Sequence, residues 1–507
     1  MDEHEKLQKL KEIRLIITEI LMFFSVILLV GFLTLIVMGY SFNLFEIGGT
    51  GEVVERTGLV QISSIPTGAT IAIDGGTPLL LRTNGSRTVL AGEHEISLSR
   101  DGFDTWTKTV NVTEGMMYRV NYPRLFLVER EPEEIIDFEK AGITFTSVTP
   151  NAERMVILVD GELGTVELNS SKPVLKKLVY QSAEQISEKT SEKITEISEI
   201  EWSGNSERLL SKINGEIVVL NIKNPLETVN LTEVISEFNK KNELERSAEQ
   251  ISEKTAEETN KKPFEKVEIK EAKFESEAGD KILILTTKNE LREVNIRDKE
   301  VSEALLENVL KFDNDGERIA YLTSEKNEEK TLFELKAYRS GAEESYLIRL
   351  VRNADVKIAA MKYFQDFYFM VEDEGLLKIY SSANWPERDD VAEKIFEGKL
   401  DFSPTILKKR GKGMVFSFEN GEKKAVFDIE ALGVTEFEAS GKTGWVDEFL
   451  RFSVGDDGKL EVLDFDGLNR KTLVEKGVEK DKVITISGNN RYLYYFEGQV
   501  LIRERIN

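Results

Sequence analysis

The amino-acid sequence predicts a mainly β protein with an N-terminal transmembrane helix, a small β-sandwich and a seven- or eight-bladed β-propeller with helical inserts. Residues 20–42 carry no charge, the segment behind them alternates apolar and polar residues between Pro and Gly turns, and a β pattern recurs from about residue 140 onward. A chain of 507 residues is long enough for two to four domains. The expected segments are a cytoplasmic tail (1–14), a transmembrane helix (15–42), a linker (43–57), the small β domain (58–128) and the propeller (129–507).

Composition narrows the possible functions. The formal net charge of −24 argues against nucleic acid and against charge-driven docking on anionic lipid, because both need a basic face. The chain has no cysteine, which excludes disulfides, thiolate nucleophiles and cysteine-ligated metals, and its two histidines are His4 and His94. A Ser-His-Asp site or a histidine-rich metal site would depend on His94 alone. Its strand-like surroundings favour an ordinary structural histidine instead.

The uncharged run at 20–42 is long enough to cross a membrane, since about 20 helical residues span a hydrocarbon core of roughly 30 Å. A cleaved signal peptide normally has a shorter apolar core of about 7–15 residues, followed by small residues at the cleavage site. Four basic residues precede the span: Lys6, Lys9, Lys11 and Arg14. Because Arg56 alone stands in the comparable stretch behind it, we expect a retained anchor with the N-terminus in the cytoplasm. An exported chain without cysteine fits a bacterial envelope.

The segment 58–128 is expected to be all β and meander-like. "TIAID" and "EHEISLSR" read as strands, and "PTGA" and "DGG" as turns, because Pro66 fixes φ and Gly68 tolerates a positive φ. The phrases "SSIPTGATIAIDG" and "LAGEHEISLSRDGFDTWTKTVNVTEG" resemble a PEGA domain, with Thr67 in place of Glu in the naming motif. The resemblance implies a small extracytoplasmic β-sandwich, often found on surface proteins, with no known catalysis.

The same resemblance implies structural roles for the motif residues. Those residues are Pro66, Gly68, Ala69, Asp74, Gly75, Gly102 and Phe103. We expect Pro66, the three glycines and Asp74 to shape turns. We expect Phe103 and Trp106 to pack in the core rather than to bind carbohydrate.

Eight candidate units of about four strands follow. The expected apolar anchors of the later units, Phe364, Phe402, Trp445 and Ile486, lie 38, 43 and 41 residues apart. A period of about 40–45 residues is typical of propeller blades. The phrases "FDNDGERIAYL", "LDFDGLNRKTLV" and "ISGNNRYLYYFEG" are similar to blades of the TolB-like, WD-related propellers. The last unit ends after its third strand, and a ring must hide its edges. We expect residues 124–130, "RLFLVER", to supply the closing strand.

No catalytic motif is present: the sequence lacks a Gly-x-Ser-x-Gly elbow, a Walker loop and a dinucleotide fingerprint. Calcium is the one metal considered, because Asp313 with Asp315, and Asp464 with Asp466, each place two carboxylates two residues apart. A full calcium loop needs about six to eight oxygens, so hairpin turns are the favoured interpretation. We expect no catalytic, cofactor-binding or metal-binding residues.

The nonamer "SAEQISEKT" occurs at 182–190 and again at 247–255, in connections between the first three blades. Its Glu, Lys, Gln and Ala content favours helix over strand. A short apolar stripe precedes the second copy: Leu231, Val234, Ile235 and Phe238. We expect helical inserts at about 182–196 and 231–262, side by side on one face of the ring, docked at the base and solvated at the tip.

These features favour a single-pass envelope protein whose extracytoplasmic propeller is a non-catalytic binding or scaffold module. The expected partners are the membrane, through one span, and an envelope protein or glycan. Two alternatives stay open: a structural component of a surface layer or cell wall, and a hydrolase or lyase with carboxylates in the propeller channel. No cofactor is expected, and the oligomeric state does not follow from the sequence.

Overall fold

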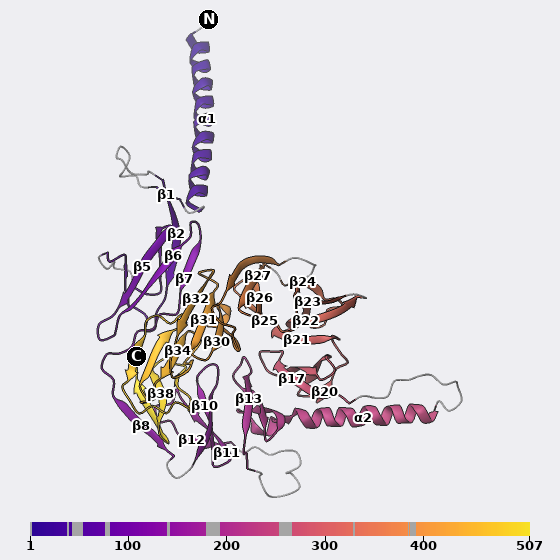
Figure 1. Cartoon of the computed structure of the whole chain (residues 1–507). Helices are drawn as coiled ribbons and strands as arrows, with labels where there is room; N and C mark the ends of the chain where they lie inside the picture. Colours follow the sequence, from indigo (N-terminus) through magenta and orange to yellow (C-terminus); the bar gives the residue numbers. More distant parts are fainter. Residues whose placement is uncertain are drawn as a thin grey trace. The chain divides into compact units, whose positions relative to one another are not determined.

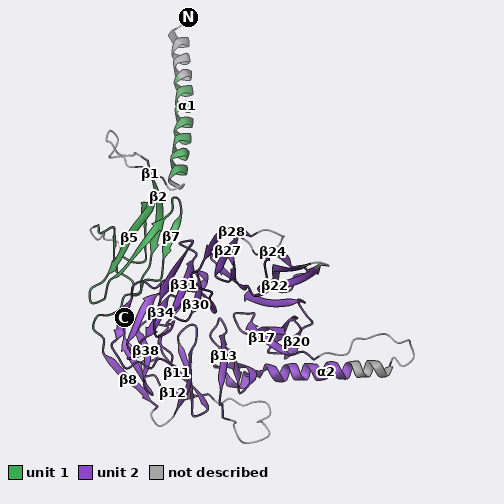
Figure 2. Cartoon of the chain, viewed as in Figure 1, with its two compact units in different colours: residues 1–129 green, residues 130–507 purple. Residues whose placement is uncertain are grey.

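In the computed structural model the chain forms two compact units, residues 1–129 and 130–507 (Figure 2). The fold is mainly β, as predicted. The structure describes residues 3–37, 40–42, 54–76, 82–138, 142–178, 193–252, 266–327, 330–383, 385 and 392–507.

The first unit begins with the helix α1, Glu3–Val37 (Figure 1). Its segment Arg14–Leu35 has a mean hydropathy of 2.6, and its side chains are all exposed. By length and composition it can span a membrane, and a signal sequence near the N-terminus passes the same test. The predicted span to residue 42 is too long, because Tyr40–Phe42 form strand β1.

Strand β1 pairs antiparallel with β2, Val54–Ile62. This pairing corrects the predicted linker as well as the span, because residues 54–57 already belong to a sheet. Their backbone groups are satisfied by Tyr40–Phe42 and by the strand that pairs with Thr57. The rest of the predicted linker, 43–53, lies outside the described residues.

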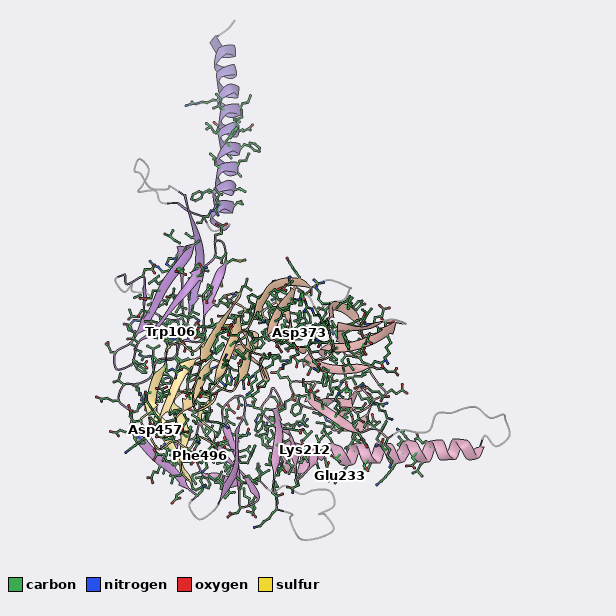
Figure 3. The ribbon with its side chains drawn as sticks, in the orientation of Figure 1. Trp106, Lys212, Glu233, Asp373, Asp457 and Phe496 are labelled. Carbon is green, nitrogen blue, oxygen red and sulfur yellow. The ribbon has the colours of Figure 1, made fainter. Side chains whose placement is uncertain are left out.

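Two small sheets follow α1 in the first unit. One contains β1, β2, β4 and β7, and the other β3, β5 and β6. Their further bounds are β3 Thr70–Ile73, β4 Gly85–Leu90, β5 Gly92–Ser99, β6 Trp106–Val112 and β7 Met117–Val120. The order is not the expected meander, because β7 returns to lie parallel beside β2. Trp106 is fully buried in this unit (Figure 3) and meets the Tyr122 ring edge-on, with centroids 5.9 Å apart.

The second unit contains eight four-stranded sheets within the described residues, which settles the blade number that the sequence left open. Neighbouring strands in each sheet are antiparallel and, in blades 1 to 7, follow chain order. Blades 1 and 2 are β9 Ile143–Val148, β10 Arg154–Val159, β11 Glu162–Glu167 and β12 Leu175–Lys177, then β13 Ile197–Trp202, β14 Arg208–Ile213, β15 Glu216–Asn221 and β16 Val229–Asn230.

Blades 3 to 5 have the same four-strand plan. Their strands are β17 Ile269–Phe274, β18 Lys281–Thr286, β19 Leu291–Asn295, β20 Glu300–Val301; β21 Val309–Asp315, β22 Arg318–Asn327, β23 Lys330–Arg339, β24 Tyr346–Val351; β25 Lys357–Tyr363, β26 Asp366–Asp373, β27 Leu376–Ser382 and β28 Glu393–Lys399. The second strands are apolar runs such as "ILIL" in β18, because both faces of a blade pack against neighbouring blades.

Blades 6 to 8 complete the ring. Their strands are β29 Ile406–Arg410, β30 Val415–Asn420, β31 Lys423–Asp428, β32 Gly433–Glu438; β33 Lys442–Trp445, β34 Leu450–Val454, β35 Leu460–Asp464, β36 Lys471–Val474; β37 Thr485–Ile486, β38 Tyr492–Glu497, β39 Val500–Arg505 and β8 Pro132–Asp137. Blade 8 is therefore closed by a strand from the start of the unit.

The closing strand is β8, not the predicted segment 124–130, which was wrong by a few residues. Arg124 and Leu127 instead form bridges with Ile65 and Phe103 inside the first unit, and Leu125 and Phe126 are buried there. The apolar residues that made the segment look like a blade strand are thus consumed by the core of the small domain.

Two of the four predicted blade anchors are also wrong. Phe364 lies in the turn between β25 and β26 with φ +52° and is 56% exposed, and Phe402 precedes β29. Trp445 and Ile486 do lie in first strands, β33 and β37.

The connection from blade 2 to blade 3 contains the helix α2, Leu231–Ser252, which runs away from the propeller (Figure 1). Its base is docked as expected: Leu231, Val234 and Ile235 are buried, whereas Leu244 is 70% exposed. Six residues of the second nonamer lie in this helix. Residues 253–262 of this insert, and residues 182–192 of the other, lie outside the described residues.

The end of the first insert, residues 193–196, is described and is not helical. The Asn214 side chain instead accepts hydrogen bonds from the Thr195 and Glu196 amides at 2.9 and 3.3 Å, which holds this segment along the edge of blade 2. The prediction of helix to residue 196 is therefore wrong at its C-terminal end.

Candidate functional site

A polar cavity of about 560 Å³ lies among the first strands of the blades. Glu201 of β13, Lys273 of β17, Asp313 of β21 and Lys409 of β29 all line it. Lys409 belongs to blade 6 yet bonds Asp313 of blade 4, which is possible only where first strands converge near the ring centre. We call this space the axial cavity.

Asp313 is the most heavily bonded carboxylate in the axial cavity. Its Oδ2 accepts from Lys409 Nζ at 2.7 Å and from the Ala360 amide at 2.9 Å, and its Oδ1 lies 3.5 Å from Lys273 Nζ. Burial alone would raise the pKa of Asp313, but the two ammonium groups outweigh burial and lower it. Asp313 therefore stays ionised and ties together the first strands of blades 3, 4, 5 and 6.

The two lysines are satisfied by the same network. Lys409 also donates to the carbonyl oxygens of Asn314 at 2.9 Å and Ala360 at 3.0 Å. Lys273 donates to the Phe312 carbonyl at 3.0 Å and lies 3.2 Å from Glu271. Burial opposes the charge on Lys273, yet the carboxylates of Asp313 and Glu271 raise its pKa.

Glu201 is different, because its carboxylate receives only one hydrogen bond from the described residues. The Phe274 amide donates to Oε1 at 3.0 Å, across the boundary between blades 2 and 3. Burial raises the pKa of Glu201 to about 7, against the opposing effects of that amide and of Lys273 and Lys409. At neutral pH this side chain is therefore divided between acid and carboxylate.

The structure separates the four aspartates considered for calcium. Asp313 faces ammonium groups and Asp315 lies beyond it at the end of β21, lining the same cavity. Asp464 accepts from Asn469 Nδ2 at 2.9 Å, and Asp466 accepts from the Leu468 amide at 3.2 Å, as in a hairpin turn. Within the described residues no group of three His, Cys, Asp or Glu side chains is arranged to hold a metal ion.

The motif residues of the small domain lie in turns and core. Gly68, Gly75 and Gly102 have φ of +83°, +65° and +80°, and Asp74 has φ +54°. The Ile65–Pro66 peptide is cis. Ala69 is fully buried, and the Arg100 guanidinium lies 5.1 Å above the partly buried Phe103 ring.

Asp74 also holds His94. Asp74 Oδ1 accepts the Glu95 amide at 2.9 Å, and Oδ2 lies 2.7 Å from His94 Nδ1. The other ring nitrogen lies 2.7 Å from the Leu90 carbonyl. Because both partners are acceptors, this arrangement fits the imidazolium form. Burial would lower the pKa of His94, but Asp74 and the Leu90 carbonyl raise it above its usual value.

Sequence reasoning missed Glu201, Lys273 and Lys409. A usable signal existed, since Glu201 and Lys273 each stand directly before the aromatic residue that ends a first strand. A charged residue beside such an anchor can extend into the space where first strands meet. Which charges meet there depends on blade register, which the sequence does not reveal.

A second hollow, of about 420 Å³, lies where α2 meets the propeller. Ile217, Ile235 and Ile269 contribute apolar lining, and Lys212, which is labelled in Figure 3, contributes a charged side chain. Asn239 fixes the helix by exchanging two 2.9 Å hydrogen bonds with the backbone of Val267. The base of α2 is thus rigidly attached to the start of blade 3.

The fold and its surfaces define a propeller protein with an apolar N-terminal helix and a small β-sandwich. Residues 57–124 match the family described as the PEGA domain, which confirms the resemblance seen in "PTGA" and the phrases after it. A search of curated proteins finds no significant match.

Several solved structures align with most of the chain at low sequence identity. The C-terminal WD40 domain of Sif2 aligns with 74% of this chain and 98% of its own, at 10% identity and a TM-score of 0.43. Porphyromonas gingivalis dipeptidyl peptidase 4 aligns with 71% of this chain and 56% of its own, at 13% identity and 0.39. PorZ, an essential surface component of the type-IX secretion system of the same organism, aligns with 72% of this chain and 43% of its own, at 12% identity and a TM-score of 0.35. These values carry no functional argument, and the propeller assignment rests on the blade topology.

Proposed function

We propose that this chain is a single-pass envelope protein, with a cytoplasmic N-terminus, whose extracytoplasmic propeller binds an envelope protein or glycan without catalysis. The observation that carries the proposal is α2. A helix of 22 residues inserted between two blades is not needed to close the ring, yet its base is docked through buried side chains. Beyond that base Leu244 is 70% exposed, where an apolar side chain is available to a partner.

The proposed orientation rests on charge. The basic residues cluster before α1's apolar segment, so the positive-inside tendency favours an internal N-terminus. The net charge of −24 suits a large exposed domain that stays soluble.

Catalysis in the channel is the second candidate, favoured by the pKa of about 7 at Glu201. Hydrolysis of a glycosidic bond generally uses two carboxylates in distinct roles. Asp313, the best-ordered second carboxylate, is instead neutralised by Lys273 and Lys409. This pairing supports binding over catalysis.

The experiment compares two exposed leucines in the full chain. Leu244→Asp places a charge on α2, and Leu226→Asp places one on an 83% exposed leucine outside α2, in the loop between β15 and β16 of blade 2. We expect the first change to remove a stoichiometric co-purifying envelope partner and the second to retain it. Equal capture by both variants would exclude α2 as the binding surface.

A further inference from the structure

We propose that the axial cavity is a binding site for a primary ammonium group, such as a lysine side chain, with the Glu201 carboxylate as its anchor. The site lies away from α2 and does not depend on the function proposed for that helix. It offers the propeller a second contact, selective for a cationic side chain.

Glu201 can accept more hydrogen bonds than the described residues donate to it. A carboxylate accepts about four hydrogen bonds, and the described residues supply one, from the Phe274 amide to Oε1. The cavity lysines do not donate to Glu201, because both direct their ammonium groups to Asp313 and to backbone or Glu271 oxygens. An incoming ammonium has three N–H groups to donate to the remaining acceptor positions of the Glu201 carboxylate.

The charged residues that line the cavity favour a cationic ligand. The cavity lining includes five carboxylates and three cations: Glu201, Glu275, Glu277, Asp313 and Asp315 against Lys273, Arg318 and Lys409. Asp313 is paired with both lysines. Glu277 and Asp315, together with the ionised fractions of Glu201 and Glu275, still leave the lining with a net negative charge. A cationic ligand offsets that excess, whereas an anion would add to it.

Glu275 also belongs to the cavity lining and is 3% exposed, and neither of its carboxylate oxygens accepts a hydrogen bond from the described residues. Burial and the neighbouring Glu293 carboxylate raise its pKa to about 7, against the opposing effects of Ser340 and Lys281. Those three neighbours lie outside the cavity lining, so Glu275 adds negative charge beside the cavity rather than a second anchor within it.

The size and walls of the cavity favour an organic cation. A volume of about 560 Å³ far exceeds one water, whose share of the liquid is roughly 30 Å³. Trp202 and Phe274 belong to the lining and offer apolar surface to a methylene chain. Gly204, Glu277 and Gly316 are exposed, so the cavity opens at the hairpin turns of blades 2 to 4.

Binding at this site must release protons. Glu201 is half protonated near pH 7, and a bound ammonium favours its carboxylate form. Lys273 and Lys409 already lower the pKa of Glu201 in the same way, whereas Asp313 raises it. About half a proton should therefore leave per ammonium bound at pH 7. The affinity for the ammonium ligand should rise about tenfold between pH 6 and pH 8, because the ionised fraction of Glu201 rises by that factor over this range.

The test is calorimetric titration of the full chain in detergent micelles with acetyl-Gly-Lys-Gly amide and with cadaverine. Acetyl-Gly-norleucine-Gly amide is the uncharged control. We expect the lysine peptide to bind, the norleucine peptide not to, and proton release to appear as a dependence of the heat on buffer ionisation enthalpy. Tighter binding of the lysine peptide than of cadaverine would identify the ligand as a lysine side chain of a polypeptide. Tighter binding of cadaverine would identify it as a free diamine.

Variants separate the site from the fold. Glu201→Gln should weaken binding roughly tenfold or more and abolish proton release, because it keeps the hydrogen-bonding shape and removes the charge. Glu196→Gln, an exposed change just before the same strand, should have no effect. Equal binding of the lysine and norleucine peptides, or an unchanged Glu201→Gln titration, would overturn the proposal. The buffer dependence of the unaltered protein tests it even if the variant unfolds. Leu244→Asp should leave ammonium binding intact, which separates this site from the α2 surface.

Discussion

Truncation of Phe496 to alanine should destabilise the ring where its ends meet. Phe496 is fully buried in blade 8 and belongs to one apolar cluster with Met155 and Ile157 of blade 1 (Figure 3). Removing a fully buried phenylalanine costs about 3–5 kcal/mol. Unfolding entropy near the midpoint is about 2.1 cal/mol/K per residue, or about 0.8 kcal/mol/K over the roughly 380 residues of the second unit. The melting temperature of that unit should therefore fall by about 4–6 °C.

The assay is scanning calorimetry of the full chain, following the larger of the two unfolding transitions. Phe364→Ala is the matched control, because that phenylalanine is 56% exposed in a turn, and it should shift the melting temperature by less than about 1 °C. Equal shifts for the two variants, or none for Phe496→Ala, would refute packing of blade 8 against blade 1.

Three further predictions concern the pKa of His94, the ion pairs of Asp313 and the orientation of the chain in the membrane. With His4 changed to Gln, NMR of the remaining His94 should give a pKa above 6.5. The contact of His94 with Asp74 then adds stability that is fully present below pH 6.5 and is lost as the pH rises through the folded-state pKa. A measured pKa below 6.5 would contradict the imidazolium contact. Asp313→Ala should cost about 3 kcal/mol, because it leaves two partly buried ammonium groups without their shared carboxylate, and an unchanged melting temperature would deny that network a structural role. Since the chain lacks cysteine, single cysteines at His4 or Leu244 report topology: an impermeant maleimide should label intact cells at the second position and not at the first, and the reverse would invert the orientation.

The β period of the sequence predicted the propeller because blade strands carry a local signal that survives without fixed motifs. The alternating strands, the turn glycines of "PTGA" and "DGG", and the apolar stripe at the base of α2 were legible for the same reason. Each of these features depends on residues a few positions apart.

What the sequence could not show depends on contacts between distant segments. The apolar run at 124–130 is as suitable for closing a blade as β8 is, and only the competing core around Phe103 decides between them. Phe364 resembled a strand anchor in the sequence because it directly follows Tyr363, the last residue of β25. The meeting of Glu201, Lys273 and Lys409 requires the register of four blades at once, which no local pattern encodes.

The most direct test of the central claim, that the propeller binds a partner through α2, is site-specific photocrosslinking on cells. A benzophenone side chain would replace Leu244 in one full-length protein and Leu226 in another, since both leucines are exposed and Leu226, in the loop between β15 and β16 of blade 2, lies outside α2. We expect a discrete adduct from position 244, in yield comparable to the protein itself, and none from 226. No adduct at 244, or the same adducts at both positions, would contradict the assignment of α2 as the binding surface.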